Sequence, residues 1–200
     1  NKHYNPSYTP IPNQEPRWYE RLIALNAYVD NLYKSAQSNT KIDQNRNNLR
    51  MDIYNSCKNV LINGMATCAG PVGSGKTTMT TATALNQASN SNASHIIVVL
   101  PYVSIITQTV DVLREALCLK GETKADMERV VAAHHHVADF SSKEDRQYAT
   151  LWDAPIIVTT AVQFFETLAS NKPSRLRKLH ELPGSIMVID ESHNSMPIEL

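Results

Sequence analysis

The feature that most constrains this chain is the phosphate-binding pattern G-x-x-x-x-G-K-[ST], which residues 70–77 match as G-P-V-G-S-G-K-T. Glycines allow the backbone to bend so that successive N–H groups converge on a phosphate. A helix predicted to begin near Lys76 adds the positive end of its dipole. In this pattern the lysine reaches the β- and γ-phosphates, and the Thr77 hydroxyl binds magnesium. The segment therefore predicts a polyphosphate site. The residues predicted to bind the polyphosphate and its metal are Gly70, Gly73, Ser74, Gly75, Lys76, Thr77 and Thr78.

Composition narrows the class of protein without naming a partner. The chain has 200 residues, with 19 Lys and Arg against 19 Asp and Glu, so a nucleic-acid partner would have to be met by a local surface. Cys57, Cys68 and Cys118 are widely spaced, which favours free thiols in a reducing compartment. The longest apolar stretch, residues 96–100, is too short to span a membrane. We expect a cytoplasmic protein with no membrane partner and, since the first residue is not Met, a piece of a longer chain.

The first part of the chain differs from the rest. Residues 1–16 hold four of the ten prolines and predict an extended linker. Apolar residues at helical spacing then predict an amphipathic helix over 17–36, and a second one that ends near Gly64. The polar stretch 37–44 separates the two helices.

From residue 65 onward, short β-rich runs alternate with helical patterns, which is typical of a parallel sheet with crossover helices. The strongest strand is His95–Leu100, which is nearly all β-branched and is expected to be buried on both faces. The predicted strands are 65–69, 95–100, 128–133, 156–159 and 185–190, and the predicted helices are 76–87, 103–117, 162–169 and 173–181.

An acidic pair follows the last predicted strand. Four apolar residues, 186–189, lead into Asp190 and Glu191 at the carboxyl end of a strand, where ligands bind in open α/β sheets. Such a strand end is common by itself, but after a complete phosphate loop it predicts a Walker B site. Asp190 would hold magnesium together with Thr77, and Glu191 would orient and deprotonate the attacking water. The predicted catalytic residues are Lys76, Asp190 and Glu191.

Residues 190–193, D-E-S-H, resemble the D-E-x-H box of superfamily 2 helicases. Two further stretches, 100–108 and 158–165, look like the segments of those helicases that contact the nucleic-acid backbone. The resemblance implies that the residues that bind nucleic acid are Pro101, Ser104, Gln108, Thr159, Thr160 and Gln163. The alternative is that these hydroxyls and amides cap helices and ordinary turns, as Ser and Thr usually do after a strand.

The amino-acid sequences of four stretches resemble those of one family, the helicase-nuclease of type I CRISPR systems. They are L-P-Y-x-S-I-I-x-Q at 100–108, the His134-His135 doublet, P-I-I-V-T-T-x-V-Q-F-F-E at 155–166 and R-K-L-H at 177–180. The resemblance runs from about Asn45 to Leu200. It implies an α/β fold, a three-layer RecA-like P-loop NTPase domain with a mainly parallel sheet, preceded by an N-terminal linker and helix. Residues 1–43 would be that linker and a helix from an upstream domain, and residues 44–200 the first helicase lobe.

That family also implies cofactors and partners. The cofactors would be ATP and Mg²⁺, and the partners single-stranded DNA, a crRNA-guided surveillance complex and an HD nuclease domain in the same or a partner chain. The activity implied is an ATP-driven translocase that unwinds target DNA in antiviral defence. Ser192 replaces the usual Ala, no His-Asp nuclease motif is present, and Gln44 is the only nearby candidate for an adenine-reading residue. The second lobe is not among these residues, so we expect the isolated chain to bind ATP weakly and hydrolyse it negligibly.

Other readings stay open. Another superfamily 2 DNA or RNA helicase, or an unrelated P-loop ATPase, would share the loop. A docking module with a vestigial ATP site is a non-enzymatic alternative, although the intact Lys76 and Asp190 argue against decay. A row of three histidines, 134–136, suggests a metal site, but neighbouring side chains on an extended backbone point to opposite faces, which favours a structural role.

Overall fold

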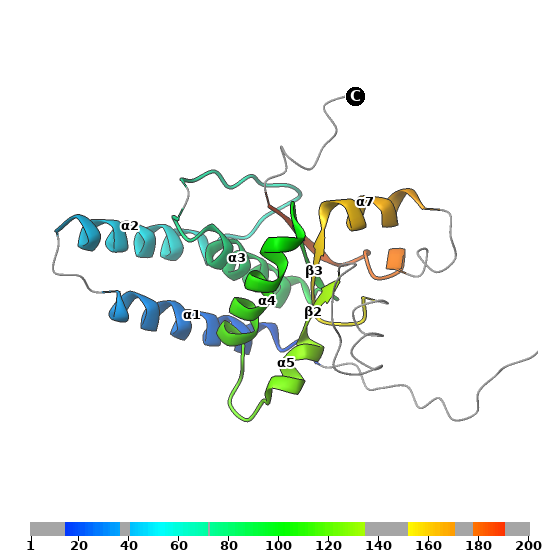
Figure 1. The fold of residues 1–200 in the computed structure, drawn as a ribbon, viewed down its shortest axis with the longest axis horizontal. Helices are drawn as coiled ribbons and strands as arrows, with labels where there is room; N and C mark the ends of the chain where they lie inside the picture. Colours follow the sequence, from blue (N-terminus) through cyan, green and yellow to red (C-terminus); the bar gives the residue numbers. More distant parts are fainter. Residues whose placement is uncertain (1–14, 37–40, 72, 135–151, 171–177, 191–200) are drawn as a thin grey trace, which may run out of the picture.

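The computed structural model describes residues 15–36, 41–71, 73–134, 152–170 and 178–190. Within them, three helices are followed by a mixture of strands and helices in the order β1, α4, α5, β2, β3, α7 and β4 (Figure 1). The helices are α1 (Trp18–Ser35), α2 (Lys41–Cys57), α3 (Lys76–Ser91), α4 (Val103–Ala116), α5 (Lys124–Val130) and α7 (Ala161–Ala169). The strands are β1 (Ile96–Leu100), β2 (Val131–His134), β3 (Ile156–Thr160) and β4 (Ile186–Ile189).

All described strands are parallel and form one sheet in the order β2-β3-β1-β4. The central strand β1 pairs Val98 with Val158 of β3 on one side and with Val188 of β4 on the other. Every residue of β1 and β3 is buried. The prediction that β1 is covered on both faces is therefore confirmed, because a run of β-branched residues can bury both sides of the pleat.

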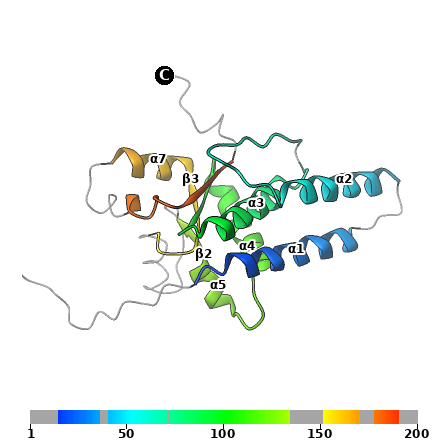
Figure 2. The same ribbon diagram turned by 180° about the vertical axis from the view of Figure 1, so that it is seen from behind.

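The sheet separates two hydrophobic clusters. Alternate residues Ile96, Val98 and Leu100 point into the larger cluster with α1, α3 and α4, whereas Ile97 and Val99 point into the smaller one. The smaller cluster contains Trp152, which precedes β3, and Phe164, which belongs to α7. Figures 1 and 2 show α7 on one side of the sheet and α1, α3 and α4 on the other. This arrangement of helix, sheet and helix confirms the predicted α/β class and agrees with a RecA-like helicase domain.

Helix α1 is part of the larger cluster, and its contacts form what we call the α1 clamp: Trp18, Arg21 and their partners. The Trp18 indole N–H donates to the Ala93 carbonyl at 2.9 Å. Arg21 is completely buried, and its guanidinium binds both carboxylate oxygens of Glu122 at 2.8 and 3.0 Å and the Leu117 carbonyl at 2.9 Å. The expected boundary between residues 43 and 44 stays a prediction, but α1 shares a core with α3 and α4.

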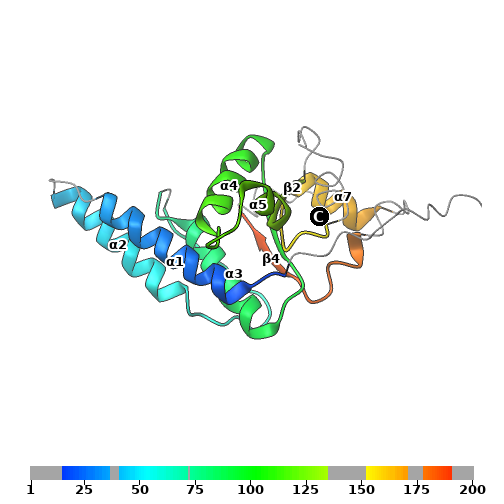
Figure 3. The ribbon, with the colours of Figure 1, turned by 90° about the horizontal axis from the view of Figure 1, so that it is seen from below.

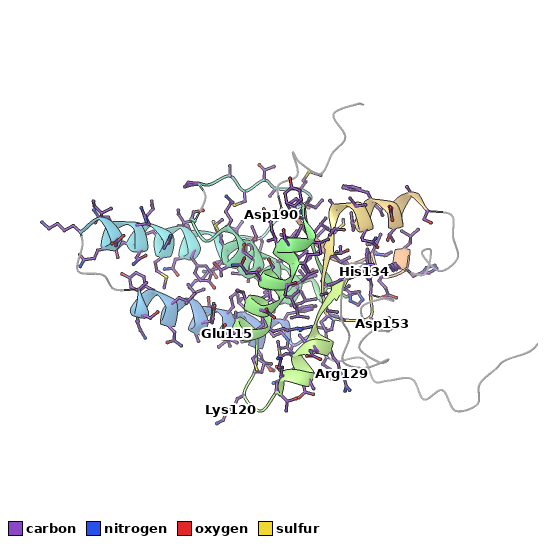
Figure 4. All side chains as sticks on the ribbon, viewed as in Figure 1. Glu115, Lys120, Arg129, His134, Asp153 and Asp190 are labelled. Atoms are coloured by element: carbon purple, nitrogen blue, oxygen red, sulfur yellow. The ribbon has the colours of Figure 1, made fainter. Side chains whose placement is uncertain are left out.

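The amino-terminal edge of the sheet is held by polar contacts. His95, just before β1, lies 2.8 Å from the Ala154 carbonyl through Nδ1 and 3.0 Å from a Glu181 carboxylate oxygen through Nε2. Asp153 belongs to the same edge (Figure 4). Burial, with a contribution from Glu181, raises the pKa of the Asp153 carboxyl. These contacts join the segments that precede β1, β3 and β4.

Several predicted bounds were wrong. Residues 65–69 form no strand and are exposed, Met65 at 93%. A strand exists only where a neighbour pairs with it, and no described strand pairs with this run. The predicted strand 128–133 begins as helix α5, because Thr123 and Asp126 form a reciprocal capping box that starts a helix there. The strand itself is Val131–His134.

Two helices have other bounds than predicted, and one prediction lies largely outside the described residues. Helix α2 begins at Lys41, inside the stretch expected to be a break, and ends at Cys57, before the predicted end near Gly64. Helix α3 continues to Ser91 despite its threonines, and the hydroxyls of Thr80, Thr81 and Thr83 donate to carbonyls four residues earlier without ending the helix. The predicted helix 173–181 is described only from residue 178.

Candidate nucleotide-binding site

The phosphate loop enters α3 through left-handed glycines. Gly73 has φ 77° and Gly75 φ 84°, and Gly75 is the N-cap of the helix. Side chains are strained in this region of φ, so glycine is needed at both positions. The first N–H groups of any helix lack intrahelical partners and carry the positive end of the dipole. The start of α3 therefore offers the donors that a phosphate requires.

Lys76 lies over the loop that precedes it. Its ammonium group donates to the Gly70 carbonyl at 2.9 Å and to the Pro71 carbonyl at 3.4 Å. A polyphosphate bound at the start of α3 would compete for this ammonium with charged oxygens, which are stronger acceptors than carbonyls. Lys76 is thus placed to exchange two backbone contacts for the phosphates.

The rest of the loop also fits a phosphate ligand. The Thr78 hydroxyl donates to the Gly75 carbonyl at 2.9 Å, whereas the Thr77 side chain is exposed at the first turn of α3. Within the described part of the chain, Ser74 Oγ is buried with no hydrogen-bond partner. A Cβ on Gly70 would lie 3.1 Å from that hydroxyl, so the loop is closed tightly at its base. The unsatisfied hydroxyl and the donors at the helix start are consistent with ATP and Mg²⁺ as ligands.

Asp190 follows β4 at the carboxyl edge of the sheet. Its N–H donates to the Val99 carbonyl at 2.9 Å, which continues the β1–β4 pairing and fixes its backbone beside the end of β1 (Figure 4). The pKa of the Cys68 thiol is affected by the charged groups around it. Although this side chain is exposed, its pKa is raised, by partial burial and by the charges of Cys57 and Asp190. Lys76 offsets part of this rise. Lys76 and Asp190 therefore act on one thiol, at the edge where the sequence predicts the ATP site.

Glu191, Ser192 and His193 lie outside the described residues, so the predicted catalytic carboxylate and the rest of the D-E-x-H box are not placed. His135 and His136 are not described either. His134 contacts Lys178 Nζ through Nε2 at 2.9 Å and packs edge-on against Trp152, with ring centroids 6.0 Å apart. In the described ranges, no group of three potential ligands is arranged to hold a metal ion.

The six residues predicted to contact nucleic acid fall into two groups. Pro101 follows β1, and Ser104 and Gln108 are exposed one turn apart on α4. By contrast, Thr159, Thr160 and Gln163 are buried. The Thr159 hydroxyl donates to the His134 carbonyl at 3.0 Å, and the Thr160 hydroxyl caps α7 by accepting the Gln163 N–H at 3.2 Å. The second group has the capping and bridging contacts of the alternative reading, and nucleic-acid contact by either group stays a prediction.

One residue near the site was missed by sequence reasoning. Arg50 of α2 donates from Nε to the Gly73 carbonyl at 2.7 Å. The only sequence signal was the position of this arginine in a helix that leads into the phosphate loop. A basic residue on an exposed helix face looks like any solvated charge until the loop is seen against it.

Comparison with known proteins supports the same class. The family model described as DEAD/DEAH box helicase matches residues 36–197. A search of curated proteins found no match. None of the helices in the described part of the chain combines the length and apolarity that a membrane crossing requires. Domains of the matched family use ATP, usually with Mg²⁺. The phosphate loop, the parallel sheet and the family match over most of the sequence lead to one conclusion: this chain belongs to the DEAD/DEAH box helicase family.

Proposed function

We propose that this chain is the first motor lobe of an ATP-dependent DNA helicase or translocase of type I CRISPR antiviral defence. The observation that carries the ATP-dependent part is the position of Lys76 on the phosphate loop and of Asp190 beside the end of β1, at the carboxyl edge of the sheet. The resemblance of residues 100–108, 155–166 and 177–180 supports the narrower assignment to the CRISPR helicase-nuclease.

In this proposal the residues divide the chemistry of ATP hydrolysis. The N–H groups at the start of α3 and the Lys76 ammonium bind the phosphates, and Lys76 stabilises the charge on the transferred phosphoryl group. Thr77 and Asp190 would hold Mg²⁺, which would supply neutralisation of the phosphate charge. Glu191 orients the attacking water and accepts its proton. The products are ADP and inorganic phosphate.

The proposed partners follow from the resemblance. Single-stranded DNA would pass the carboxyl edge of the sheet, where Ser104 and Gln108 are exposed and Pro101 is partly exposed. Thr159, Thr160 and Gln163 would act there by holding the backbone of the β3–α7 junction. A crRNA-guided surveillance complex would recruit the protein, and an HD nuclease domain in the same or a partner chain would cut the strand. The setting would be cytoplasmic, without a membrane partner.

The isolated 200 residues are expected to bind ATP weakly and to hydrolyse it negligibly. The γ-phosphate would face solvent on the side where a second lobe supplies an arginine, and this charge stabilisation accounts for much of the rate in such enzymes. Robust DNA-stimulated turnover by residues 1–200 alone would contradict this expectation.

The experiment that tests the proposed function measures ATP turnover by the full-length protein with single-stranded DNA, with single-stranded RNA and with neither. Stimulation by DNA alone supports the proposal. Stimulation by RNA alone would favour an RNA helicase of the same superfamily instead. Lys76→Ala is compared with Lys120→Ala, an equal charge change at an exposed residue away from the loop (Figure 4). If both variants keep full function, the site is vestigial and the chain is a docking module.

A further inference from the structure

Arg50 reaches the phosphate loop from an element that the nucleotide chemistry does not use. Its Nε donates to the Gly73 carbonyl at 2.7 Å, across 23 positions of sequence. A Cβ built on Gly73 would lie 3.5 Å from Arg50 Nη2, so the guanidinium also packs against the face of this glycine. The contact is a charge-assisted hydrogen bond to one specific backbone carbonyl of the loop.

The peptide unit that Arg50 contacts is held from both sides. Its carbonyl, from Gly73, faces Arg50, and its N–H, from Ser74, donates to the Pro71 carbonyl at 3.3 Å. Because the carbonyl and N–H of a trans peptide point in opposite directions, fixing one fixes the other. Gly73 has φ 77°, and glycine has little intrinsic preference for that conformation over others. The contact from Arg50 therefore adds to the internal bond of Ser74 in keeping this peptide in one orientation.

Three loop carbonyls thus accept hydrogen bonds from cations. Those of Gly70 and Pro71 accept from Lys76, and that of Gly73 accepts from Arg50. A carbonyl oxygen turned toward a bound phosphate would repel it, since both carry negative charge. Lys76 is expected to leave its carbonyls when a nucleotide binds. Arg50, which comes from another helix, is placed to keep its contact in both states.

Arg50 is itself oriented by a chain of hydrogen bonds. Its Nη1 donates to Asn47 Oδ1 at 3.3 Å, and Asn47 Nδ2 donates to the Ala36 carbonyl at the end of α1 at 2.6 Å. Beside them, the Tyr33 hydroxyl donates to Asn48 Oδ1 at 2.6 Å. Figure 3 shows α1 and α2 extending together away from the sheet. The guanidinium is therefore presented to the loop by a pair of joined helices.

We propose that Arg50 is a positioning residue for the phosphate loop, holding the Gly73–Ser74 peptide in the orientation that receives a nucleoside triphosphate. The proposal rests on the ATP-dependent function proposed above and names a determinant of that same site. It assigns to α2 a role in nucleotide affinity. Arg50 touches the loop and not the reacting atoms, so it acts on binding more than on the chemical step.

The test measures the dissociation constant of a fluorescent ADP analogue with Mg²⁺, and KM and kcat for ATP, in the full-length protein. Arg50→Ala is expected to weaken nucleotide binding and to raise KM by about tenfold, with kcat changed less than about twofold. Arg46→Ala removes the same charge one turn away on an exposed part of the same helix. It is expected to leave the dissociation constant and KM unchanged. Asn47→Ala is expected to act in the same direction as Arg50→Ala, with a smaller effect.

Conservative variants separate positioning from charge. Arg50→Gln keeps an N–H donor without charge, and Arg50→Lys keeps charge with a different geometry. Positioning predicts that both restore part of the affinity, whereas restoration by lysine alone would show that only charge matters and would overturn the proposal. Hydrogen exchange of residues 70–78 is expected to be faster in Arg50→Ala with an unchanged melting temperature.

Two negative results are distinguishable. If the unaltered protein does not bind the analogue, the proposed function fails and not merely the role of Arg50. If the unaltered protein binds and folded Arg50→Ala binds equally well, the proposed function survives and the role of Arg50 is rejected. Because Arg50 is exposed, the variant is expected to fold; if Arg50→Ala does not, the glutamine and lysine variants decide the question.

Discussion

Arg21 and Lys76 both donate to backbone carbonyls, but their surroundings give them different tasks. Arg21 in the α1 clamp is completely buried and paired with both oxygens of Glu122. Lys76 is partly exposed and contacts only carbonyls of its own loop in the bonds that the described residues show. A buried charge must keep its partner, because removing one member leaves the other as an uncompensated buried charge. A charge held by exposed carbonyls can exchange them for a ligand. The comparison teaches that the clamp serves stability and the loop serves binding.

The largest expected effect is on the clamp. Arg21→Ala leaves the Glu122 carboxylate without its main partner and should lower the free energy of unfolding by about 3–5 kcal/mol. Urea unfolding monitored by circular dichroism measures this loss. Replacing both partners, with Arg21→Met and Glu122→Leu together, should be less harmful than Arg21→Ala alone. A loss below 1 kcal/mol for Arg21→Ala would remove the distinction between the two regions.

The second effect is on the loop. Lys76→Ala should lower ATP turnover of the full-length protein by about 10²- to 10³-fold, because an electrostatic partner of the phosphates is lost. Its free energy of unfolding should change by no more than about 0.5 kcal/mol, as for other surface substitutions. Turnover and urea unfolding are measured on the same preparation. Strong destabilisation by Lys76→Ala would show that the loop is also a structural clamp.

A smaller effect is expected from glycine in the left-handed conformation. Gly75→Ala, at φ 84°, should cost about 1–2 kcal/mol of stability and should also weaken nucleotide binding, because it strains the N-cap of α3. Gly121→Ala is the matched control, since Gly121 has φ 94° in a connection with nothing within 4 Å of its added Cβ. Both variants should lose similar stability. Only Gly75→Ala should raise the dissociation constant of the ADP analogue.

The smallest effect is the pH dependence of the clamp. Burial alone would raise the pKa of Glu122, but hydrogen bonds from Arg21 and the Leu119 N–H, with the charge of Arg21, hold it below its usual value of 4.5. A lowered pKa in the folded state means stability that is present above the unfolded pKa and lost as pH falls through the folded pKa. Urea unfolding between pH 7 and pH 3 should show this loss, at about 1.4 kcal/mol for each unit of pKa difference. Glu122→Gln should flatten the dependence.

Asp153 supplies the opposite slope and therefore a control. Its pKa is raised, so its contribution to stability is present below the unfolded pKa, which lies near 3.8, and is lost as pH rises through the folded pKa. Asp153→Asn should make the acid loss caused by Glu122 steeper. An unchanged profile in both variants would show that neither carboxyl couples protonation to folding.

Elements whose pattern is local could be predicted from the sequence. β1 was recognised because five consecutive apolar residues suit a strand buried on both faces, and α4 because its apolar residues recur at helical spacing. Residues 65–69 were assigned wrongly because a strand depends on the neighbour that pairs with it, which a short apolar run does not reveal. The boundary between α5 and β2 was missed because the Thr123–Asp126 capping box outweighs the β-branched residues that follow.

Parts of the candidate site were beyond sequence reasoning for a similar reason. The hydroxyls of Ser104 and Thr159 look alike in sequence, but one lies on an exposed face of α4 and the other is buried against His134. Burial depends on which helix covers a strand end. The contact between Arg50 and Gly73 likewise joins residues that local patterns treat separately.

The sequence by itself determined the phosphate loop, the elements β1, α4, β3, α7 and β4, and the helicase class, because each depends on residues close together in the chain. Only the tertiary structure decided which charges are buried, which hydroxyls face solvent and which helix supports the loop. Arg21, Arg50 and Lys76 are all basic residues, and local sequence does not separate the three tasks that the contacts suggest. Their roles differ because folding places one in the core, one against a distant glycine and one over its own loop.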